Sequence, residues 1–205
     1  MNDESPGNLA PGMRTYLPAL AELGDELLEV FLSRFRPVAY RKGDYFVREG
    51  QTSRYIAFIL RGCLMCVYNK DGKELIDEFS FENEFISDYR SFVTGAPADK
   101  DILCLEDCEL LVLGYESLQE LYATHPGMER GGRLIAEMLL FQWQVRVKSF
   151  LLDDAETRYR NLLETRPSLF QRVPQYLIAQ YLAVSPETLS RIRKKIVLDA
   201  PPDRS

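Results

Sequence analysis

The chain has 205 residues, a formal net charge of −6 and a pI of about 5.0, with 46% hydrophobic and 27% charged residues. Such a chain can form one or two small soluble domains with a real core. Its apolar runs fall well short of the roughly 20 residues that a transmembrane helix needs, and its first five residues are acidic where a signal peptide is basic. We therefore expect a cytoplasmic protein and exclude the membrane-spanning and secreted classes.

Both ends of the chain have the composition of flexible segments. Prolines and glycines interrupt residues 1–14, and two adjacent prolines lie within residues 199–205. The first regular pattern is helical and covers residues 16–36, where apolar side chains recur at helical spacing. These apolar residues are Leu17, Leu20, Leu23, Leu27, Leu28, Phe31, Leu32 and Phe35.

From residue 38 to about residue 114 the pattern changes to short runs rich in β-branched and aromatic residues. The clearest runs cover residues 45–47, 55–60, 63–68 and 110–113. Glycine turns interrupt them at Lys42-Gly43, Glu49-Gly50, Arg61-Gly62 and Asp71-Gly72, and the last is the clearest hairpin turn. Evenly spaced short strands with such breaks predict a compact antiparallel roll or barrel.

After Pro126-Gly127, residues 128–153 carry a long helical pattern. Its apolar stripe is wider than packing on one small roll requires, so we expect one face to pack on the roll and another on the same helix of a second copy. The alternative is a helix buried entirely within the monomer. The stripe for the twin helix contains Leu134, Met138, Phe141 and Val145.

The segment from Arg172 to Lys195 has the pattern of a DNA-binding helix-turn-helix. Ser185 followed by Pro186 is a strong helix start, because the Ser hydroxyl can cap the first turn and Pro has its φ already helical. A shorter amphipathic helix is predicted from Gln175 to Leu182, and only a tight turn at Ala183-Val184 separates the two. The apolar residues assigned to this shorter helix are Tyr176, Leu177, Ala179 and Leu182.

In the helix that begins at Pro186, Leu189 and Ile192 form an apolar stripe, and the opposite face is polar. The second helix of such a pair enters the major groove, where Glu accepts from cytosine N4 and Arg bridges guanine O6 and N7. Glu187 and Arg191 are therefore candidates for base readout. The polar face contains Glu187, Ser190, Arg191 and Lys194.

The alternative interpretation of Glu187 and Arg191 is an i, i+4 salt bridge on a solvated helix face. The charge distribution favours a DNA reader. Residues 158–195 hold eight basic and two acidic residues, a net charge of +6, so the rest of the chain sums to −12. A basic terminal module on an acidic chain is what phosphate contacts require.

The sequence offers few residues for catalysis or metal binding. Cys63 and Cys66 are three residues apart, but side chains at i and i+3 on a strand point to opposite faces, so the pair cannot readily chelate a metal. We interpret these residues, with Cys104 and Cys108, as buried structural thiols. The single histidine, His125, cannot complete a catalytic triad or a histidine-based zinc site, and the chain has no P-loop. We expect neither an enzyme nor a metal site.

The order of helix, roll, long helix and helix-turn-helix over about residues 16–197 resembles the CRP/FNR family of bacterial transcription regulators. The matching residues are Gly43, Gly50 and Gly62 at roll-turn spacing, and Ser185-x-Glu187-Thr188-x-x-Arg191 in the recognition helix. The resemblance implies an α+β fold with an antiparallel β-roll of the double-stranded β-helix or jelly-roll type at residues 15–126. A dimerisation helix (127–153) and a helix-turn-helix domain (154–198) would follow.

The resemblance also implies a homodimer that binds a pseudo-palindromic operator in double-stranded DNA, with RNA polymerase as a candidate partner. It assigns base readout to Glu187 and Arg191 and a phosphate contact to Gln175. The complete candidate DNA-binding set is Gln175, Ser185, Glu187, Thr188, Ser190, Arg191 and Lys194.

Several departures from the family pattern concern the DNA-binding end. Pro186 stands where the most familiar family motif has a base-reading Arg, and Ala183 replaces the usual turn Gly. The wing, a β-hairpin after the recognition helix, is expected to be cut short to Ile196-Val197-Leu198. The N-terminal cysteine cluster of the iron-sulfur members is missing, so we expect no oxygen-sensing cluster.

Family members that bind cyclic AMP carry Phe-x-Gly-Glu, then about nine residues, then Arg-Ser/Thr-Ala. Here Ser87 and Asp88 replace Gly-Glu, and Ala98 and Asp99 replace Arg-Ser. Losing the guanidinium removes a charge-assisted partner worth roughly 1.5 to 3 kcal/mol, and Asp99 adds a like charge beside the phosphate. We expect weak or no binding of cyclic AMP or cyclic GMP.

Arg90 and Lys100 are the only nearby cations that could replace the missing guanidinium, and we favour a surface role for both. The effector is thus unknown, and its pocket is degenerate. The candidate pocket residues are Phe85, Ser87, Asp88, Arg90, Ala98, Asp99 and Lys100.

The sequence therefore predicts a sequence-specific DNA-binding transcription regulator. The alternative is a sensor or adaptor module that does not bind DNA, and that binds a small ligand or a protein through the roll.

Overall fold

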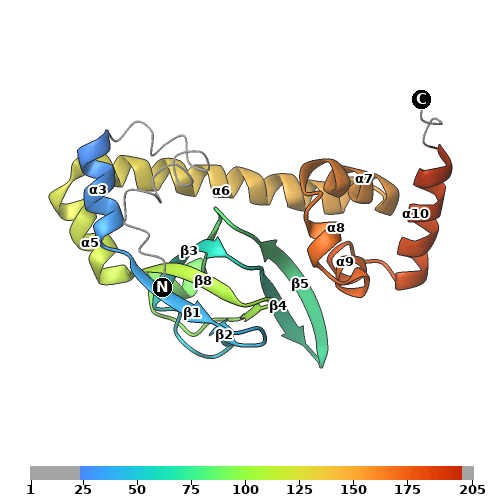
Figure 1. Cartoon of the computed structure of the whole chain (residues 1–205), viewed down its shortest axis with the longest axis horizontal. Coiled ribbons are helices and arrows are strands. Elements are labelled where there is room, and N and C mark those ends of the chain that lie inside the picture. Colours follow the sequence, from blue (N-terminus) through green and yellow to red (C-terminus); the bar gives the residue numbers. More distant parts are fainter. Residues whose placement is uncertain (1–23, 200–205) are drawn as a thin grey trace.

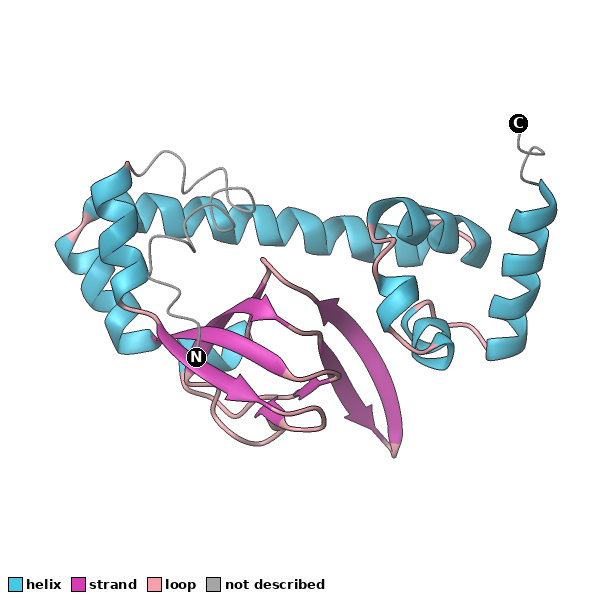
Figure 2. Cartoon of the chain, in the orientation of Figure 1, coloured by secondary structure: helices cyan, strands magenta, loops and turns pink. Residues whose placement is uncertain are grey.

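The computed structural model describes residues 24–199. Helix α3 leads into strands broken by one short helix, and the remainder of the described chain is helical (Figures 1 and 2). The strands are β1 (Arg36–Tyr40), β2 (Tyr45–Val47), β3 (Tyr55–Arg61), β4 (Leu64–Lys70), β5 (Lys73–Ser80), β6 (Phe85–Ile86), β7 (Asp101–Cys104) and β8 (Cys108–Gly114). The helices are α3 (Asp25–Ser33), α4 (Tyr89–Thr94), α5 (Tyr115–Thr124), α6 (Pro126–Leu152), α7 (Ala155–Thr165), α8 (Leu169–Arg172), α9 (Gln175–Tyr181) and α10 (Pro186–Asp199).

The strands form two antiparallel four-stranded sheets, in the orders β1-β8-β3-β6 and β2-β7-β4-β5. One hydrophobic cluster fills the space between them, with Ala57 and Ile59 from one sheet and Leu64 and Ile102 from the other. Alternate side chains on the same strands point outward, as the period of two in a strand requires. The predicted antiparallel β-roll is confirmed.

The hairpin predicted at Asp71-Gly72 joins β4 to β5, where Lys70 pairs with Lys73. Asp71 has φ 54° and Gly72 has φ 76°, and two consecutive positive φ values are the requirement of a type I′ turn. The predicted strand runs correspond to β2, β3, β4 and β8. Strands β1, β5, β6 and β7 and the short helix α4 have no individual counterpart among the predicted runs.

Helices α3, α5 and α6 cover the outer face of the first sheet. Leu28 of α3, Leu121 of α5 and Met128 of α6 join Phe58 and Leu111 of the sheet in one cluster. The helix predicted over residues 16–36 ends at Ser33 in the structure, because β1 begins at Arg36. The predicted flexible residues 1–14, and Leu17, Leu20 and Leu23 of the helical stripe, lie outside the described residues.

The C-terminal helices pack on the outer face of the second sheet. Met65 and Val67 of β4, which point away from the interior of the roll, share a cluster with Leu177 and Ile178 of α9. The rings of Phe79 in β5 and Tyr181 in α9 lie 5.3 Å apart between centroids. Figure 1 shows α8 and α9 between β5 and α10, so the last helix lies at the end of the molecule farthest from the roll.

The four cysteines are free and buried, as predicted. Cys63 belongs to the cluster under the C-terminal helices, whereas Cys66 belongs to the cluster inside the roll, so the two side chains lie on opposite faces of the sheet. Burial raises the pKa of the Cys63 thiol to about 12, which keeps it protonated and unreactive at neutral pH. Within residues 24–199, no three His, Cys, Asp or Glu side chains are placed to hold a metal ion, and no helix is suited to crossing a membrane.

Candidate functional site

Helix α10 begins at Pro186, as predicted, and Ser185 caps it. The backbone N–H of Thr188 donates to Ser185 Oγ at 3.2 Å, which satisfies one of the free donors in the first turn. A hydrogen bond with the Ser185 side chain lowers the pKa of Glu187, so this carboxyl is ionised at neutral pH. Ser185 therefore caps the start of the helix and favours the ionised form of the first candidate base-reading residue.

The two faces of α10 are divided as the sequence predicts. Leu189 is 2% exposed and Ile192 is 9% exposed, and both join the cluster under the C-terminal helices. On the opposite face four polar side chains are exposed to solvent: Glu187, Ser190, Arg191 and Lys194. A polar face of this length on the outermost helix is free to contact a large partner (Figure 1).

The structure disfavours the salt-bridge interpretation of Glu187 and Arg191. These two described residues form no ion pair with each other. Arg191 Nη2 instead donates to Thr188 Oγ1 at 3.2 Å, one turn back on the same helix. Thr188 thus helps to orient the guanidinium and uses only one of its donors.

Helix α9 packs against the buried face of α10. Ala179 is fully buried, because its small side chain permits the helices to cross closely. Gln175, the first residue of α9, is exposed. One part of the predicted apolar stripe is wrong. Tyr176 is 58% exposed, whereas Ile178 and Tyr181 are buried, because the buried face of α9 contacts β5 as well as α10.

The turn between the two helices holds Ala183 at φ 54°, in the left-handed region. The Ala183 N–H donates to the Gln180 carbonyl at 2.9 Å, and the Val184 N–H donates to the Ala179 carbonyl at 2.9 Å, so the turn is closed in this conformation. The family's usual Gly would adopt it without strain, since it has no Cβ.

Replacing Ala183 by Gly should therefore raise the free energy of unfolding by about 1 kcal/mol, because relief of left-handed strain exceeds the added entropy of the unfolded chain. Urea denaturation of the two proteins measures this difference. The same exchange at Ala179, a buried helical position, should destabilise the protein and serves as the control. Destabilisation by Ala183→Gly would contradict the expectation.

The basic residues of the C-terminal module are not all available to DNA. Arg166 pairs with Glu84 and donates to the Phe79 carbonyl at 2.8 Å, and both acceptors belong to the roll. Arg160 and Lys195 both contact Glu156. Arg191, Arg193 and Lys194 form no ion pair with another described residue, so the charge free to meet phosphate is concentrated on α10.

Arg172 is held by two carboxylates of the roll, an arrangement that we call the Arg172 clasp. Its guanidinium donates to Glu82 Oε1 at 2.9 Å and to Glu106 Oε1 at 3.1 Å, with a further hydrogen bond to each carboxylate. Glu82 also accepts from the Gly62 N–H at 2.8 Å. The clasp ties α8 to two loops of the roll, so Arg172 joins the two parts of the molecule.

The segment equivalent to the cyclic-nucleotide cassette is closed by its own side chains. Asp88 is 2% exposed, caps α4 by accepting from the Ser91 N–H at 2.9 Å, and accepts weakly from the Asp99 N–H at 3.4 Å. Ala98 is buried, and its backbone pairs with Gly50 and Gln51. A phosphate placed here would meet the Asp88 and Asp99 carboxylates.

The two cations proposed as substitutes behave differently. Arg90 lies at the surface, where it pairs with Asp99 at 3.2 Å and donates to the Pro97 carbonyl. Lys100 does not have the surface role that we favoured: its side chain is 14% exposed and pairs with Asp77 of β5 at 3.0 Å. The adjacent sheet supplies both this partner and the Tyr68 ring, whose centroid lies 5.6 Å from Lys100 Nζ.

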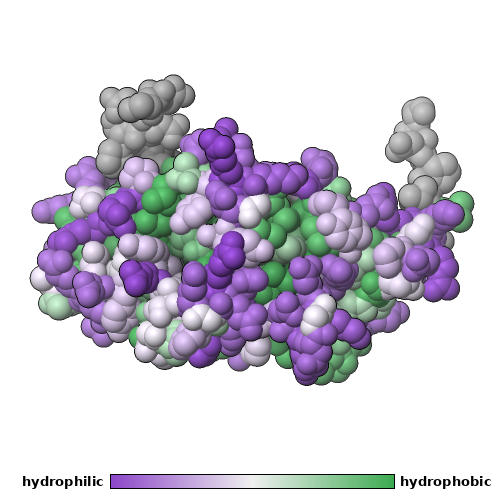
Figure 3. All heavy atoms as spheres, turned by 90° about the horizontal axis from the view of Figure 1, so that it is seen from below, coloured by the Kyte–Doolittle hydropathy of each residue, from purple (hydrophilic) through white to green (hydrophobic). Residues whose placement is uncertain are grey.

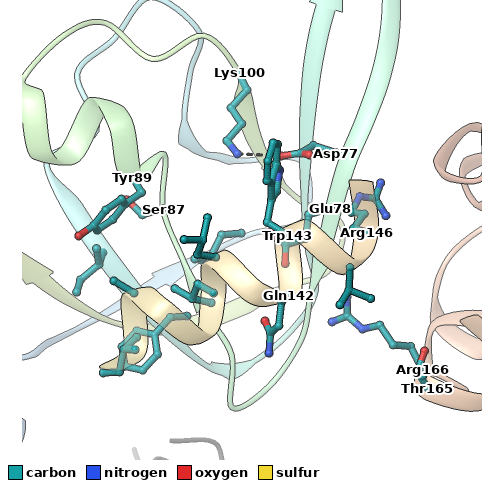
Figure 4. Close-up of a pocket in the computed structure, with 18 of the residues that line it drawn as sticks. Asp77, Glu78, Ser87, Tyr89, Lys100, Gln142, Trp143, Arg146, Thr165 and Arg166 are labelled. Carbon is teal, nitrogen blue, oxygen red and sulfur yellow. Dashed lines mark hydrogen bonds and ion pairs between the residues drawn. The ribbon is translucent and has the colours of Figure 1, made fainter. Parts of the chain in front are cut away.

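Lys100 contributes to a cavity of about 1040 Å³ between the roll, α6 and the C-terminal helices. Phe85 and Ser87 of the predicted set also line it, and Ser87 Oγ donates to the Tyr55 carbonyl at 3.0 Å. Asp88, Arg90, Ala98 and Asp99 do not line it. Figure 4 shows the Asp77–Lys100 pair on the roll side and Gln142, Trp143 and Arg146 on α6.

Sequence reasoning missed most of this cavity. Asp77, Glu78, Trp143 and Arg146 were not among the predicted pocket residues. The one available signal was that Trp143 is the only tryptophan of the chain and lies within an apolar surface wider than packing on the roll requires.

Helix α6 spans Pro126–Leu152, within one residue of the prediction at each end. Phe141 is 63% exposed and Val145 is 69% exposed, so this part of the stripe is not buried within the monomer. Leu134 is half-buried, and Met138 packs against the cluster on the first sheet instead of lying free. The exposed part of the stripe therefore begins at Phe141. Figure 3 shows another face of the molecule, where hydrophilic residues are interspersed with hydrophobic patches.

The prediction of a strand remnant after the recognition helix is wrong. Residues 196–198 form part of the last turns of α10, which continues to Asp199. Asp199, the first residue of the expected flexible tail, is the last residue of α10, and residues 200–205 lie outside the described part. Within residues 186–199 the backbone is helical throughout and contains no β-hairpin.

Comparison with known proteins agrees with this architecture. Residues 37–125 match the family model of the cyclic nucleotide-binding domain. Over 186 residues the chain is 22% identical to the cAMP-activated global transcriptional regulator CRP of Pasteurella multocida, covering 84% of this chain and 88% of that protein.

Two solved structures share the fold across most of the chain. The c-di-GMP responsive global regulator CLP of Xanthomonas campestris has a TM-score of 0.66 at 22% identity and covers 85% of this chain and 92% of its own. FixK2 from Bradyrhizobium japonicum has a TM-score of 0.64 at 17% identity and covers 80% of this chain and 85% of its own.

Residues 37–125 therefore form a domain of the cyclic nucleotide-binding type. The chain as a whole has the fold of the CRP/FNR-type regulators, with a β-roll, a long helix and a C-terminal helical module. The resemblance stated from the sequence is confirmed.

Proposed function

We propose that this chain is a homodimeric, sequence-specific DNA-binding transcription regulator. The observation that carries the proposal is the capped, solvent-exposed polar face of α10, which presents Glu187 and Arg191 at the outer end of a CRP-type fold. Its parts are a β-roll domain at 15–126, a dimerisation helix at 127–153 and a DNA-binding domain at 154–198. The protein performs no catalysis in this proposal.

In the proposed complex, the recognition helices of two copies enter successive major grooves about 34 Å apart on a pseudo-palindromic site. Glu187 and Arg191 contact base edges, while Gln175 and Lys194 contact phosphates; Ser185 and Thr188 position them, and Ser190 lies on the same face. Pro186 has no side-chain donor, so the site lacks one base contact of the family motif. A signal at the roll shifts a pre-existing equilibrium in the pose of α10.

The competing function is an adaptor module that binds ligands through the roll and does not bind DNA. A salt titration of binding to random and to selected DNA separates the two. A DNA reader loses affinity steeply as salt rises, yet it retains a preference for the selected sequence. Binding with no sequence preference at any salt concentration would favour the adaptor.

Dimerisation through α6 gives a separate expectation. Replacing Phe141 and Val145 by Glu should weaken the dimer by at least about tenfold, because a carboxylate buried in an apolar contact costs several kcal/mol. Sedimentation equilibrium measures the dissociation constant. Gln144→Glu adds the same charge to an exposed position outside the stripe and is the control. An unchanged dissociation constant in the Phe141→Glu and Val145→Glu proteins would show that the interface lies elsewhere.

The closed cassette predicts that cyclic AMP and cyclic GMP bind weakly or not at all. The Asp88 and Asp99 carboxylates lie where the family motif places the phosphate-binding residues, and the guanidinium beside them, that of Arg90, is already paired with Asp99. Isothermal titration calorimetry should give no constant tighter than micromolar for either nucleotide. As a control, titration of the same sample with selected DNA shows that the protein is folded and able to bind DNA.

A further inference from the structure

Two arginines lie against the Phe150 ring at the end of the cavity nearest the C-terminal helices. The guanidinium carbon of Arg146 lies 5.0 Å from the centroid of the Phe150 ring, and that of Arg158 lies 5.1 Å from the same centroid. Arg146 also lies 3.9 Å from the centroid of Tyr181 in α9. All four side chains line the cavity, at the corner where α6, α7 and α9 come together.

The hydrogen bonds of Arg158 leave its charge unneutralised. Its Nη1 donates to the Asp153 carbonyl at 2.7 Å, and its Nη2 donates to the Leu182 carbonyl at 3.0 Å. Carbonyl oxygens accept hydrogen bonds but carry no net charge. The Nε–H is buried and has no hydrogen-bond partner among the described residues. The guanidinium thus adds a positive charge to this corner of the cavity, although its Nε–H is closed off from the open space.

Arg146 likewise forms no ion pair with another described residue, and its contacts are with the two aromatic rings. Asp153 and Glu78 are acidic side chains of the cavity wall, and Asp153 Oδ2 accepts from Ser149 Oγ at 2.6 Å. Among the other cations of the wall, Lys100 pairs with Asp77 and Arg166 pairs with Glu84. Positive charge without an ion pair among the described residues is therefore left at Arg146, Lys148 and Arg158.

The rest of the cavity toward the middle of α6 is largely apolar. Leu139, Leu140 and Trp143 line it from α6, and Ile86 lines it from the roll. Pockets of this kind hold the apolar body of a ligand, while a few polar groups fix its orientation. The flat Trp143 ring favours a planar body, because aromatic rings stack with offset faces.

We propose that Arg146 and Arg158 bind the anionic group of a small effector whose planar apolar body lies along Trp143. The anion is a phosphate or a carboxylate; it accepts from the Arg146 guanidinium, and Arg158 contributes its positive charge. This inference names the effector class for the proposed regulator and rests on that function only for its regulatory meaning. The site differs from the cassette at residues 85–100, which is closed by Asp88.

An effector held there would connect the long helix to the helix-turn-helix. Arg158 binds the carbonyl of Leu182, the residue that ends α9 before the turn at Ala183. An anion bound by Arg146 attracts the Arg158 guanidinium in competition with this carbonyl, and so acts on the turn that positions α10. Occupancy of the cavity is thus coupled to the pose of the recognition helix.

The test uses two matched dyes and the natural fluorescence of Trp143, the only tryptophan in the chain. Anilinonaphthalene sulfonate is a planar apolar anion, and N-phenylnaphthylamine has the same ring system without the charge. Both are titrated into the full-length protein, and quenching of Trp143 by energy transfer reports binding in the cavity. The sulfonate should bind the natural protein more tightly than the uncharged dye.

Arg146→Met should lower the affinity for the anionic dye by about tenfold, because a charge-assisted contact is lost. The affinity for the uncharged dye should change by less than about threefold. Arg146→Lys should retain most of the affinity, and Arg133→Met, whose Arg pairs with Glu137 on the same helix, should change neither dye. Equal losses for both dyes, or no loss for the anionic dye, would overturn the proposal. Circular dichroism confirms that each variant is folded.

Competition then identifies the source of the anion. Displacement of the dye by cyclic di-GMP and not by naphthoate indicates a phosphate ligand, and the reverse indicates a carboxylate ligand. Displacement by neither, with the dyes themselves insensitive to Arg146→Met, contradicts the site. No DNA is present in these titrations, so their outcome is independent of the proposed DNA-binding function.

Discussion

Replacing Arg172 by Ala should lower the free energy of unfolding by about 2 kcal/mol, because the Glu82 and Glu106 carboxylates then lose their shared cation. The side chains of the clasp are between 26% and 36% exposed, so water screens part of the repulsion that remains and the loss is smaller than for a fully buried pair. Urea denaturation at neutral pH measures the difference between the two proteins.

The effect of Arg172→Ala should depend on pH. Burial acts to raise the pKa of Glu82, but the hydrogen bonds from Arg172 and the Gly62 N–H outweigh it and lower the pKa below its ordinary value of 4.5. A lowered folded pKa stabilises the protein above the unfolded value, and this contribution is lost as pH falls through the folded value. The difference between wild type and variant should therefore shrink below pH 4.5.

Arg160→Ala is the matched control, since Arg160 forms its i, i+4 pair with Glu156 within one helix. This pair is worth only about 0.3 to 0.5 kcal/mol. Arg172→Ala should also leave the salt dependence of DNA binding unchanged, because Arg172 is turned toward the roll. A reduced salt dependence with unchanged stability would show instead that Arg172 contacts phosphate.

The second large effect concerns Arg191. Arg191→Ala should weaken binding to the selected DNA site by roughly 1 to 3 kcal/mol and relax the preference at one base pair, as expected for loss of a bidentate contact to guanine. Arg191 Nη2 donates to Thr188 Oγ1 at 3.2 Å, so the side chain is oriented before DNA binds. Competition titrations against a panel of single-base variants of the site measure both changes.

Arg193→Ala tests whether the loss is specific to the reading face. Arg193 is exposed on α10 but lies outside the face shared by Glu187, Ser190 and Arg191. Removal of the Arg193 side chain should lower the affinity for all DNA sequences by a similar factor, as for a phosphate contact, or leave it nearly unchanged. An Arg191→Ala protein with unchanged affinity and unchanged preference would show that the proposed docking of α10 is wrong.

The parts of the fold that were predicted correctly depend on local signals. Ser185-Pro186 defines the start of α10, and Asp71-Gly72 defines the β4–β5 hairpin, because capping and turn conformation involve neighbouring residues. The β-rich runs of β3, β4 and β8 were visible for the same reason. Strand β5 was missed because its exposed polar residues obscure the apolar side chains that pack on α9.

The errors arise from contacts between residues far apart in the chain. Arg166 and Arg172 were counted as phosphate-binding charge, but each pairs with a carboxylate more than 60 residues away, and no local pattern identifies those partners. Lys100 was assigned to the surface because its partner Asp77 lies on a different strand. Tyr176 was assigned to the apolar stripe but is exposed, because α9 packs on the roll through Ile178 and Tyr181, which helical periodicity alone does not predict.

The central claim is that α10 reads a DNA sequence, and selection of bound fragments from a random pool of double-stranded DNA tests it without knowledge of the effector. We predict enrichment of a pseudo-palindromic site whose half-sites lie about one helical turn apart, and loss of that enrichment with Arg191→Ala. A pool that stays random after repeated rounds at moderate salt would contradict the account and leave the adaptor module as the function of the chain.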